Sequence, residues 1–241
     1  MDKSKVIGII TGVGIVALMV VAIVLIAMGT PVTHTIPFGY TTIIEMADST
    51  KTYEGIDPDS IVATSDVTGN LPEKITGSPD AKVIIYEYAD YACSHCAEMN
   101  TYVKKLVDTY DGDVAVVFRG FLLNGYPNNV EAAAATNAAA IQGYWEKYKN
   151  LVFSEQATWF YLTGDKILPY FGNLFVEASD GQGDLEKFYE DMKSESVKKK
   201  IAFDHAMGTK IELTGTPTFR INGEKIPTNE LTTKIDELLA K

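Results

Sequence analysis

The feature that most constrains this chain is the position of its two cysteines, Cys93 and Cys96, shortly after an apolar run. That run, Val83–Tyr88, is rich in β-branched and aromatic residues, which is typical of a buried strand. From Met99 to Tyr110, apolar residues recur every three or four positions, which predicts a helix. A fold for this chain must therefore hold both thiols where a buried strand passes into a helix.

The rest of the chain predicts a second strand, a block of helices and a final hairpin. Val114–Arg119 is another apolar run, and two buried strands joined by a helix predict a parallel pair. Residues 128–153 predict one long helix, whose many alanines we attribute to helix propensity, and two or three more helices follow. Asn222-Gly223 between two short strands is a strong type I′ hairpin signal, and an amphipathic helix ends the chain.

This order of elements is that of the thioredoxin topology, in which a parallel strand–helix–strand unit is joined to an antiparallel hairpin. The predicted fold is therefore α/β, a thioredoxin fold over residues 71–241. The helices between its two halves form a helical insertion at about 125–210.

The N-terminal region contains 23 consecutive uncharged residues, Val6–Met28. As a helix this stretch would be about 35 Å long, enough to cross a hydrocarbon core of roughly 30 Å. Lys3 and Lys5 precede it, and the positive-inside tendency places residues 1–5 in the cytoplasm. We therefore predict an N-terminal transmembrane helix at 6–28 that anchors the chain in the cell membrane, with a cleaved signal peptide as the alternative.

Residues 29–70 are mixed and polar, so we predict an extracytoplasmic linker between the anchor and the domain. The net charge of the chain is −11. Because phosphate binding needs clustered cations, this charge predicts no nucleic-acid partner.

The cysteine pair has the spacing and position of a redox site. At a helix N-terminus, Cys93 meets the positive end of the helix dipole and unpaired N–H groups, which favour the thiolate. His95, if protonated, adds a nearby cation. A stabilised thiolate favours the reduced dithiol and makes the disulfide an oxidant. We predict Cys93 as the nucleophile and Cys96 as the resolving thiol.

Three other interpretations of the pair compete with redox chemistry. A structural disulfide closing four residues would add only about 2 kcal/mol. A structural zinc site needs four ligands, and besides His95 the chain offers only His34 and His205. Two inert buried thiols are the third interpretation. We predict no metal and no bound cofactor.

Three further residues are candidates for the site: Glu87, Thr216 and Pro217. Glu87 alternates with apolar residues in the first strand, so its carboxyl would point inwards beneath the cysteines and exchange protons with Cys96; a solvated, edge-facing glutamate is the alternative. Asp90 is expected to be a solvated turn residue. Pro217 opens a strand, and Thr216 before it would offer its backbone to an incoming peptide if their peptide bond is cis.

The chain resembles the DsbA-type branch of the thioredoxin superfamily, especially its membrane-anchored members. The resemblance rests on "GSPDAKVIIYEYADYACSHC", "NAAAIQGYWEKYKNLVF" and "GTPTFRINGEKI" in this order, and covers about residues 75–241. It implies Cys93 as the attacking thiol, Cys96 as the resolving thiol, Glu87 as the buried acid and a cis bond before Pro217. His95 matches the histidine of the family's Pro-His pair, but Ser94 replaces the proline, which bears on the strength of the oxidant.

The resemblance also implies a function. It predicts an extracytoplasmic protein disulfide oxidase that acts on the thiols of unfolded secreted or surface proteins and is re-oxidised by a quinone-linked membrane partner of the DsbB or VKOR kind. A reductase or isomerase of the same fold, and a peptide-binding module with an idle cysteine pair, are the alternatives.

Overall fold

The computed structural model describes residues 35–48 and 52–241. The predicted cytoplasmic end at 1–5 and the membrane anchor at 6–28 lie outside the described residues. Among the residues that are described, no helix has the length and apolar character needed to span a bilayer. Residues Ile36–Lys241 form one compact unit.

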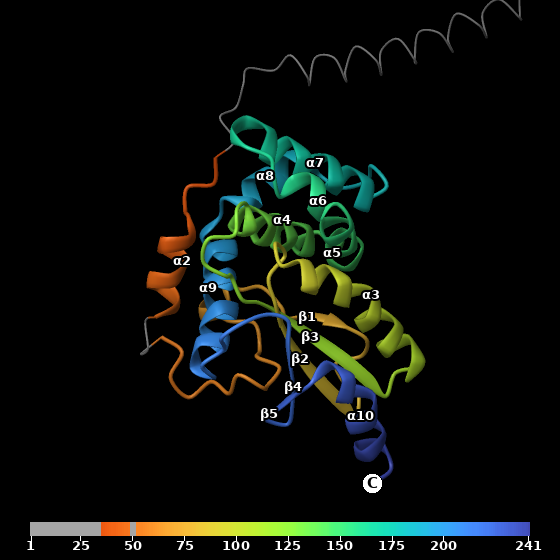
Figure 1. The fold of residues 1–241 in the computed structure, drawn as a ribbon. Coiled ribbons are helices and arrows are strands. Elements are labelled where there is room, and N and C mark those ends of the chain that lie inside the picture. Colours follow the sequence, from red (N-terminus) through yellow and green to blue (C-terminus); the bar gives the residue numbers. More distant parts are fainter. Residues whose placement is uncertain (1–34, 49–51) are drawn as a thin grey trace, which may run out of the picture. The chain divides into compact units, whose positions relative to one another are not determined.

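The unit is built on a five-stranded sheet with the order β1-β3-β2-β4-β5 (Figure 1). Strands β2 (Val83–Ala89) and β3 (Val114–Gly120) pair in parallel, as the sequence predicts. Strands β4 (Thr218–Ile221) and β5 (Glu224–Ile226) form the expected antiparallel hairpin. A further strand that the sequence did not predict is β1 (Lys74–Thr76), which has three residues and runs antiparallel to β3.

The hairpin turn has the geometry that its sequence predicts. Asn222 and Gly223 have φ values of 51° and 81°. A type I′ turn needs positive φ at both central residues, and asparagine and glycine adopt it at the lowest cost.

Helices cover both faces of the sheet. Helices α3 (Ser94–Thr109) and α10 (Leu231–Leu239) share a core with Val83 and Ile85 of β2. On the other face, Tyr86 and Tyr88 pack with Phe203 of α9 (Glu195–Lys210). Side chains alternate between the two faces along a strand, so Glu87 shares the face of Val83 and Ile85.

The helical insertion gathers mostly at one end of the sheet (Figure 1). The predicted single helix over 128–153 is wrong: it divides into α4 (Asn129–Ile141) and α5 (Trp145–Ser154). Gly143 has φ 83°, and the N–H groups of Gly143 and Tyr144 donate to the carbonyls of Ala140 and Ala139, which is a Schellman end. The other helices are α6 (Gln156–Trp159), α7 (Ile167–Ala178), α8 (Leu185–Met192) and α9.

The alanines of α4 are packing residues as well as good helix formers. Six of them are at most 2% exposed: Ala132, Ala133, Ala134, Ala135, Ala138 and Ala139. Helix α4 contacts α5, α7, α8 and α9, and small side chains allow those helices to approach it from several sides. The attribution to helix propensity alone is therefore incomplete.

The predicted linker at 29–70 extends too far towards the C-terminus. Helix α2 (Tyr40–Ala47) lies against α9, and its Ile43 is fully buried. Tyr53 packs on Phe203 with ring centroids 6.0 Å apart. The few apolar residues of this polar segment therefore pack on α9, and from Ile36 onwards its described residues belong to the compact unit.

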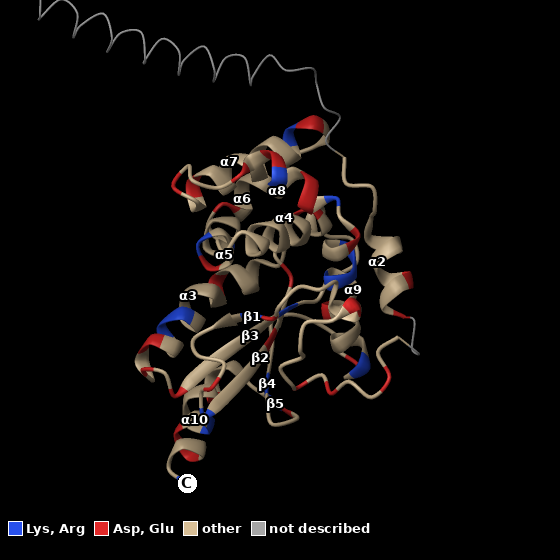
Figure 2. Cartoon of the chain, turned by 180° about the vertical axis from the view of Figure 1, so that it is seen from behind, with Lys and Arg blue, Asp and Glu red and all other residues tan. Residues whose placement is uncertain are grey.

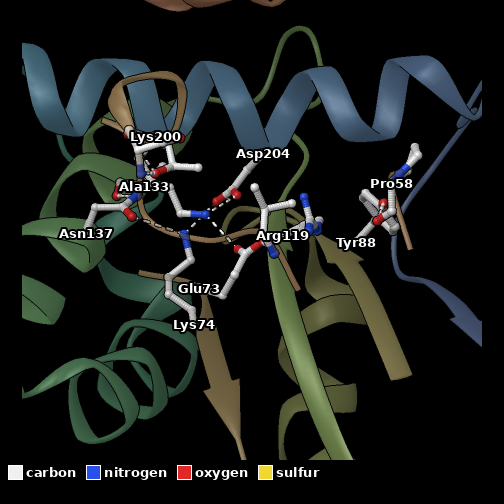
Figure 3. Close-up of polar contacts among 12 residues, drawn as sticks. Pro58, Glu73, Lys74, Tyr88, Arg119, Ala133, Asn137, Lys200 and Asp204 are labelled. Carbon is white, nitrogen blue, oxygen red and sulfur yellow. Dashed lines mark hydrogen bonds and ion pairs between the residues drawn. The ribbon is translucent and has the colours of Figure 1, made fainter. Parts of the chain in front are cut away.

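Five buried charged residues join α9 to the sheet (Figure 3). Lys200 of α9 lies 2.7 Å from the Glu73 carboxylate and 2.8 Å from Asp204. Lys74 of β1 lies 2.6 Å from Asp204, and Arg119 of β3 lies 2.7 Å from Glu73. Their side chains are at most 3% exposed. We call these five residues the buried charge cluster.

The pKa of Asp204 shows how this cluster is held together. Burial alone would raise the pKa, but the charges of Lys200 and Lys74 outweigh burial and lower it to about 2.

The other charged residues are spread over the helices and loops with both signs interspersed (Figure 2).

We expect Asp204→Asn to lower the free energy of unfolding by about 3–5 kcal/mol, because buried Lys74 loses the carboxylate it pairs with and buried Lys200 keeps only Glu73. Asp180→Asn is the matched control, since it breaks the exposed Lys147–Asp180 pair, and we expect it to cost less than about 1 kcal/mol. Urea unfolding at pH 7 measures both. Equal losses in the two variants would contradict a structural role for the cluster.

Candidate active site

Both cysteines lie at the junction of β2 and α3, as predicted. Cys93 is the N-cap residue of α3 and Cys96 lies in its first turn. Their exposed fractions are 4% and 0%, and both are free thiols. The Cys93 N–H donates to the Asp90 carbonyl at 3.0 Å, which fixes the turn between strand and helix.

The Cys93 sulfur is surrounded by hydrogen-bond donors. Its pKa is lowered to about 5, chiefly by a hydrogen bond from the Cys96 thiol, while burial opposes the shift. The Thr216 hydroxyl and the backbone N–H groups of Cys96 and His95 lower it further. The Thr216 hydroxyl is buried without another partner, which leaves it available to the sulfur. The predicted backbone contribution is therefore real but secondary to the neighbouring thiol.

Cys96 has the opposite acidity. Burial raises its pKa well above that of an ordinary thiol, and its hydrogen bond to Cys93 raises it further. Cys96 therefore keeps its proton and donates a hydrogen bond to the Cys93 sulfur. One thiol is ionised at the end of the helix, and the other is protonated in its first turn.

His95 lies in the first turn of α3. The residue is exposed, and its backbone N–H is its contribution to the acidity of Cys93. A cation on the His95 side chain stays a prediction.

Thr216 and Pro217 lie where the resemblance implies. The peptide bond between them is cis, and the Thr216 carbonyl oxygen is 3.4 Å from the Cys93 sulfur. The loop before β4 therefore lies against the N-terminus of α3, although more than a hundred residues separate the two in the sequence.

Glu87 is buried, with 2% of its surface exposed, so the inward orientation is confirmed. Burial raises its pKa to about 7, although the charge of Lys149 acts in the other direction. Lys149 comes from α5, is 3% exposed, and lies 4.7 Å from the centre of the Trp145 ring. Sequence reasoning missed Lys149, because its helix carries no motif that distinguishes this lysine from a solvated one.

The expectation that Asp90 is a solvated turn residue is wrong. Its side chain is fully buried, and its carboxylate accepts hydrogen bonds from the N–H groups of Ala92 at 2.8 Å and Leu123 at 2.6 Å. The Asn129 side-chain amide donates a third bond at 3.0 Å. These donors replace water, yet burial still raises the pKa of Asp90 to about 6. Asp90 thereby joins the cysteine loop to the start of α4.

The arrangement provides a nucleophile, a protonated second thiol and two buried carboxyl groups. Across the described ranges 35–48 and 52–241, His, Cys, Asp and Glu form no group of three or more suited to a metal ion. The chemistry that these residues support is thiol–disulfide exchange at Cys93.

We expect the Cys93 thiol to titrate with a pKa of about 5 in the ultraviolet absorbance of the reduced protein, because hydrogen bonds stabilise its thiolate. Cys93→Ser should abolish this transition, and Cys96→Ser should shift it, because the donor changes. A first thiol transition above about 8, the range of a free cysteine, would refute this account of the site.

We expect Glu87 to make folding less favourable as pH rises. Its folded pKa of about 7 lies above the ordinary value of 4.5, so its contribution is fully present below about pH 4.5 and lost as pH rises through 7. Ionisation of Glu87 should lower the free energy of unfolding by on the order of 3 kcal/mol over this range, and Glu87→Gln should remove this decrease. Urea unfolding from pH 4.5 to 7.5 measures it.

Glu98→Gln, which changes an exposed glutamate of α3, is the control and should leave the pH dependence unaltered. If the wild-type and Glu87→Gln curves run parallel between pH 4.5 and 7.5, the carboxyl of Glu87 does not titrate there.

Comparison with known proteins places this geometry among related folds. A thioredoxin-like oxidoreductase from Silicibacter pomeroyi is 26% identical, covers 74% of this chain and 99% of its own, and superposes with a TM-score of 0.58. Wolbachia pipientis alpha-DsbA1 is 23% identical, covers 70% of this chain and 94% of its own, and has a TM-score of 0.55.

A curated relative has a different name. The Na(+)/H(+) antiporter NhaA 1 of Mycolicibacterium gilvum is 27% identical over 161 residues, which are 64% of this chain and 24% of the antiporter. The chain therefore spans about a quarter of the length of the curated relatives that it matches.

The family assignment rests on most of the described chain. Residues 70–241 match the family described as Thioredoxin, from just before β1 to the C-terminus. The match includes the cysteine pair, the cis-Pro217 loop and the helical insertion. This chain belongs to the thioredoxin family.

Proposed function

We propose that the chain is a membrane-tethered, extracytoplasmic thiol–disulfide oxidoreductase that introduces disulfides into unfolded secreted or surface proteins. The observation that carries the proposal is the unequal acidity of the two thiols. A thiolate stabilised at Cys93 makes the reduced pair the favoured state, so the oxidised pair transfers its disulfide to a substrate. Membership of the thioredoxin family, and the resemblance to a thioredoxin-like oxidoreductase, support thiol–disulfide chemistry.

The proposed reaction begins with the Cys93–Cys96 disulfide. A substrate thiolate attacks the Cys93 sulfur, a new S–S bond forms, and the Cys93–Cys96 bond breaks with its electron pair on Cys96. Cys96 takes up a proton, as its raised pKa requires. A second substrate thiolate attacks the substrate sulfur of the mixed disulfide, and Cys93 leaves as a thiolate. Two substrate thiols are oxidised and the enzyme disulfide is reduced by two electrons.

Glu87 is the proposed proton source for Cys96. Its side chain is buried and shares the sheet face that α3 covers. A pKa of about 7 keeps a fraction of this carboxyl protonated near neutral pH, which suits a group that gives and recovers a proton.

The anchor at 6–28 and the partners complete the proposal. The apolar stretch would hold the domain at the outer face of the membrane. The reduced pair must pass two electrons to an acceptor, and a quinone-linked membrane protein of the DsbB or VKOR kind would lie at the same surface.

We expect Cys96→Ala to accumulate mixed disulfides: its Cys93 thiolate attacks a disulfide of a substrate in the reverse of the proposed reaction, one substrate thiolate leaves, and no Cys96 thiol remains to displace the bound substrate from Cys93. The variant is expressed in cells, thiols are blocked, and adducts are detected as bands that a reductant removes. Cys93→Ser is the control and should form none. An absence of adducts from Cys96→Ala would argue against covalent exchange at this site.

The reduction potential of the Cys93/Cys96 pair, measured from its equilibrium with glutathione, distinguishes an oxidase from a reductase. We expect a potential well above that of thioredoxin, about −270 mV, because the Cys93 thiolate stabilises the reduced pair. A value near −270 mV would instead identify a reductase.

A further inference from the structure

The Asp90 carboxylate lies where three segments of the chain meet beside the cysteines. One of its oxygens accepts the N–H of Ala92, in the cysteine loop, at 2.8 Å. The other accepts the N–H of Leu123, in the loop after β3, at 2.6 Å and the side-chain amide of Asn129, in α4, at 3.0 Å. All three partners are donors, and hydrogen bonds to the charged form of a carboxyl favour that form. The pKa of Asp90 is about 6, so the group carries its charge at pH 7 even though its side chain is fully buried.

The titratable side chains that face Asp90 from other elements, in the part of the chain that the structure describes, are neutral at pH 7. Burial raises the pKa of Tyr40 in α2 and of Tyr126 in the loop after β3, and the charge of Asp90 raises both further. His205 of α9 accepts the N–H of Leu122 at 3.2 Å, and burial lowers its pKa to about 4. Asp90 therefore has hydrogen-bond donors but no counter-charge among these groups, and a buried charge is screened less than an exposed one.

The Cys93 thiolate is a second negative charge in the same loop. Asp90 precedes Cys93 by three residues, and its carbonyl accepts the Cys93 N–H at 3.0 Å, which holds the two residues together. The thiolate raises the pKa of Asp90, so the two charges repel each other. A disulfide carries no charge, and this repulsion therefore exists only when the pair is reduced.

We propose that Asp90 is a positioning residue that acts through Cys93: its carboxylate disfavours the reduced cysteine pair and thereby weakens the disulfide as an oxidant. The inference rests on the thiol–disulfide exchange of the proposed function. Coupling between two sites is reciprocal, so the carboxylate destabilises the thiolate as much as the thiolate destabilises the carboxylate.

Proton uptake follows from this coupling. When two substrate thiolates reduce the pair, the S–S bond breaks, one electron pair stays on Cys93 as the thiolate, and the other stays on Cys96, which takes up a proton. Asp90 then takes up part of a second proton from solvent, because its pKa is higher beside the thiolate. The charge of Asp90 is present above its pKa of about 6 and is lost as pH falls through this value. The penalty on the reduced pair is therefore lost below about pH 6.

The test measures the equilibrium constant K for reduction of the Cys93–Cys96 disulfide by glutathione, from pH 5 to pH 8, in the full chain. We expect Asp90→Asn to raise K by about three- to tenfold at pH 8 and by less than about twofold at pH 5, where the carboxyl of the reduced wild-type protein is largely protonated. The Cys93 pKa in the ultraviolet titration should fall in the same variant. Asp165→Asn is the matched control, since it removes an equal charge from an exposed residue of the insertion, and it should leave K unchanged at every pH.

A second measurement needs no substitution. Carbon-13 NMR gives the pKa of the Asp90 carboxyl in the oxidised and in the reduced wild-type protein, and we expect it to be higher by about 0.5–1 in the reduced protein. Equal values in the two states overturn the inference, as does a Cys93 pKa that rises in Asp90→Asn, or an increase in K that is the same at pH 5 and pH 8. If glutathione disulfide cannot oxidise Cys93 and Cys96 to a disulfide, the proposed function itself fails.

Discussion

The hydrogen bond from the Cys96 thiol to the Cys93 sulfur is the interaction on which the chemistry of this protein depends. It exists because burial gives the two thiols unequal acidities: Cys96 is enclosed and holds its proton, whereas Cys93 is placed among donors at the end of α3. When the two sulfurs join in a disulfide, no thiolate remains for these donors to stabilise. The stabilisation therefore belongs to the reduced state alone, and in the proposed function this difference favours transfer of the disulfide to a substrate.

The helical insertion takes part in this arrangement and does more than cover the sheet. Its residues reach the active site from three helices: Asn129 binds the Asp90 carboxylate, Lys149 lies near Glu87, and Gln156 binds the backbone of Cys93. Farther from the thiols, the buried charge cluster connects α9 to β1 and β3. A shift of the insertion would therefore change the electrostatics of the site as well as its walls.

The sequence predicts the elements whose signals are local. The apolar runs of β2 and β3, the Asn222-Gly223 turn and the Cys93–Cys96 spacing each depend on neighbouring residues, and all are found where predicted. The missed features depend on distant partners. Lys74 and Asp204 are 130 residues apart, and the Asp90 carboxylate is matched by Leu123 and Asn129, so nothing beside either residue shows that it is buried.

Burial and hydrogen bonding together explain the order in which the acidic groups of the site lose their protons. In free side chains the carboxyls ionise several pH units before a thiol. Here Cys93 has a pKa of about 5, Asp90 about 6 and Glu87 about 7, so the thiol ionises first. Burial raises the carboxyl pKa values, whereas hydrogen bonds to the sulfur outweigh its burial. Near neutral pH the site therefore combines a charged sulfur with a carboxyl that still carries part of its proton, and Cys96 needs such a donor when its disulfide breaks.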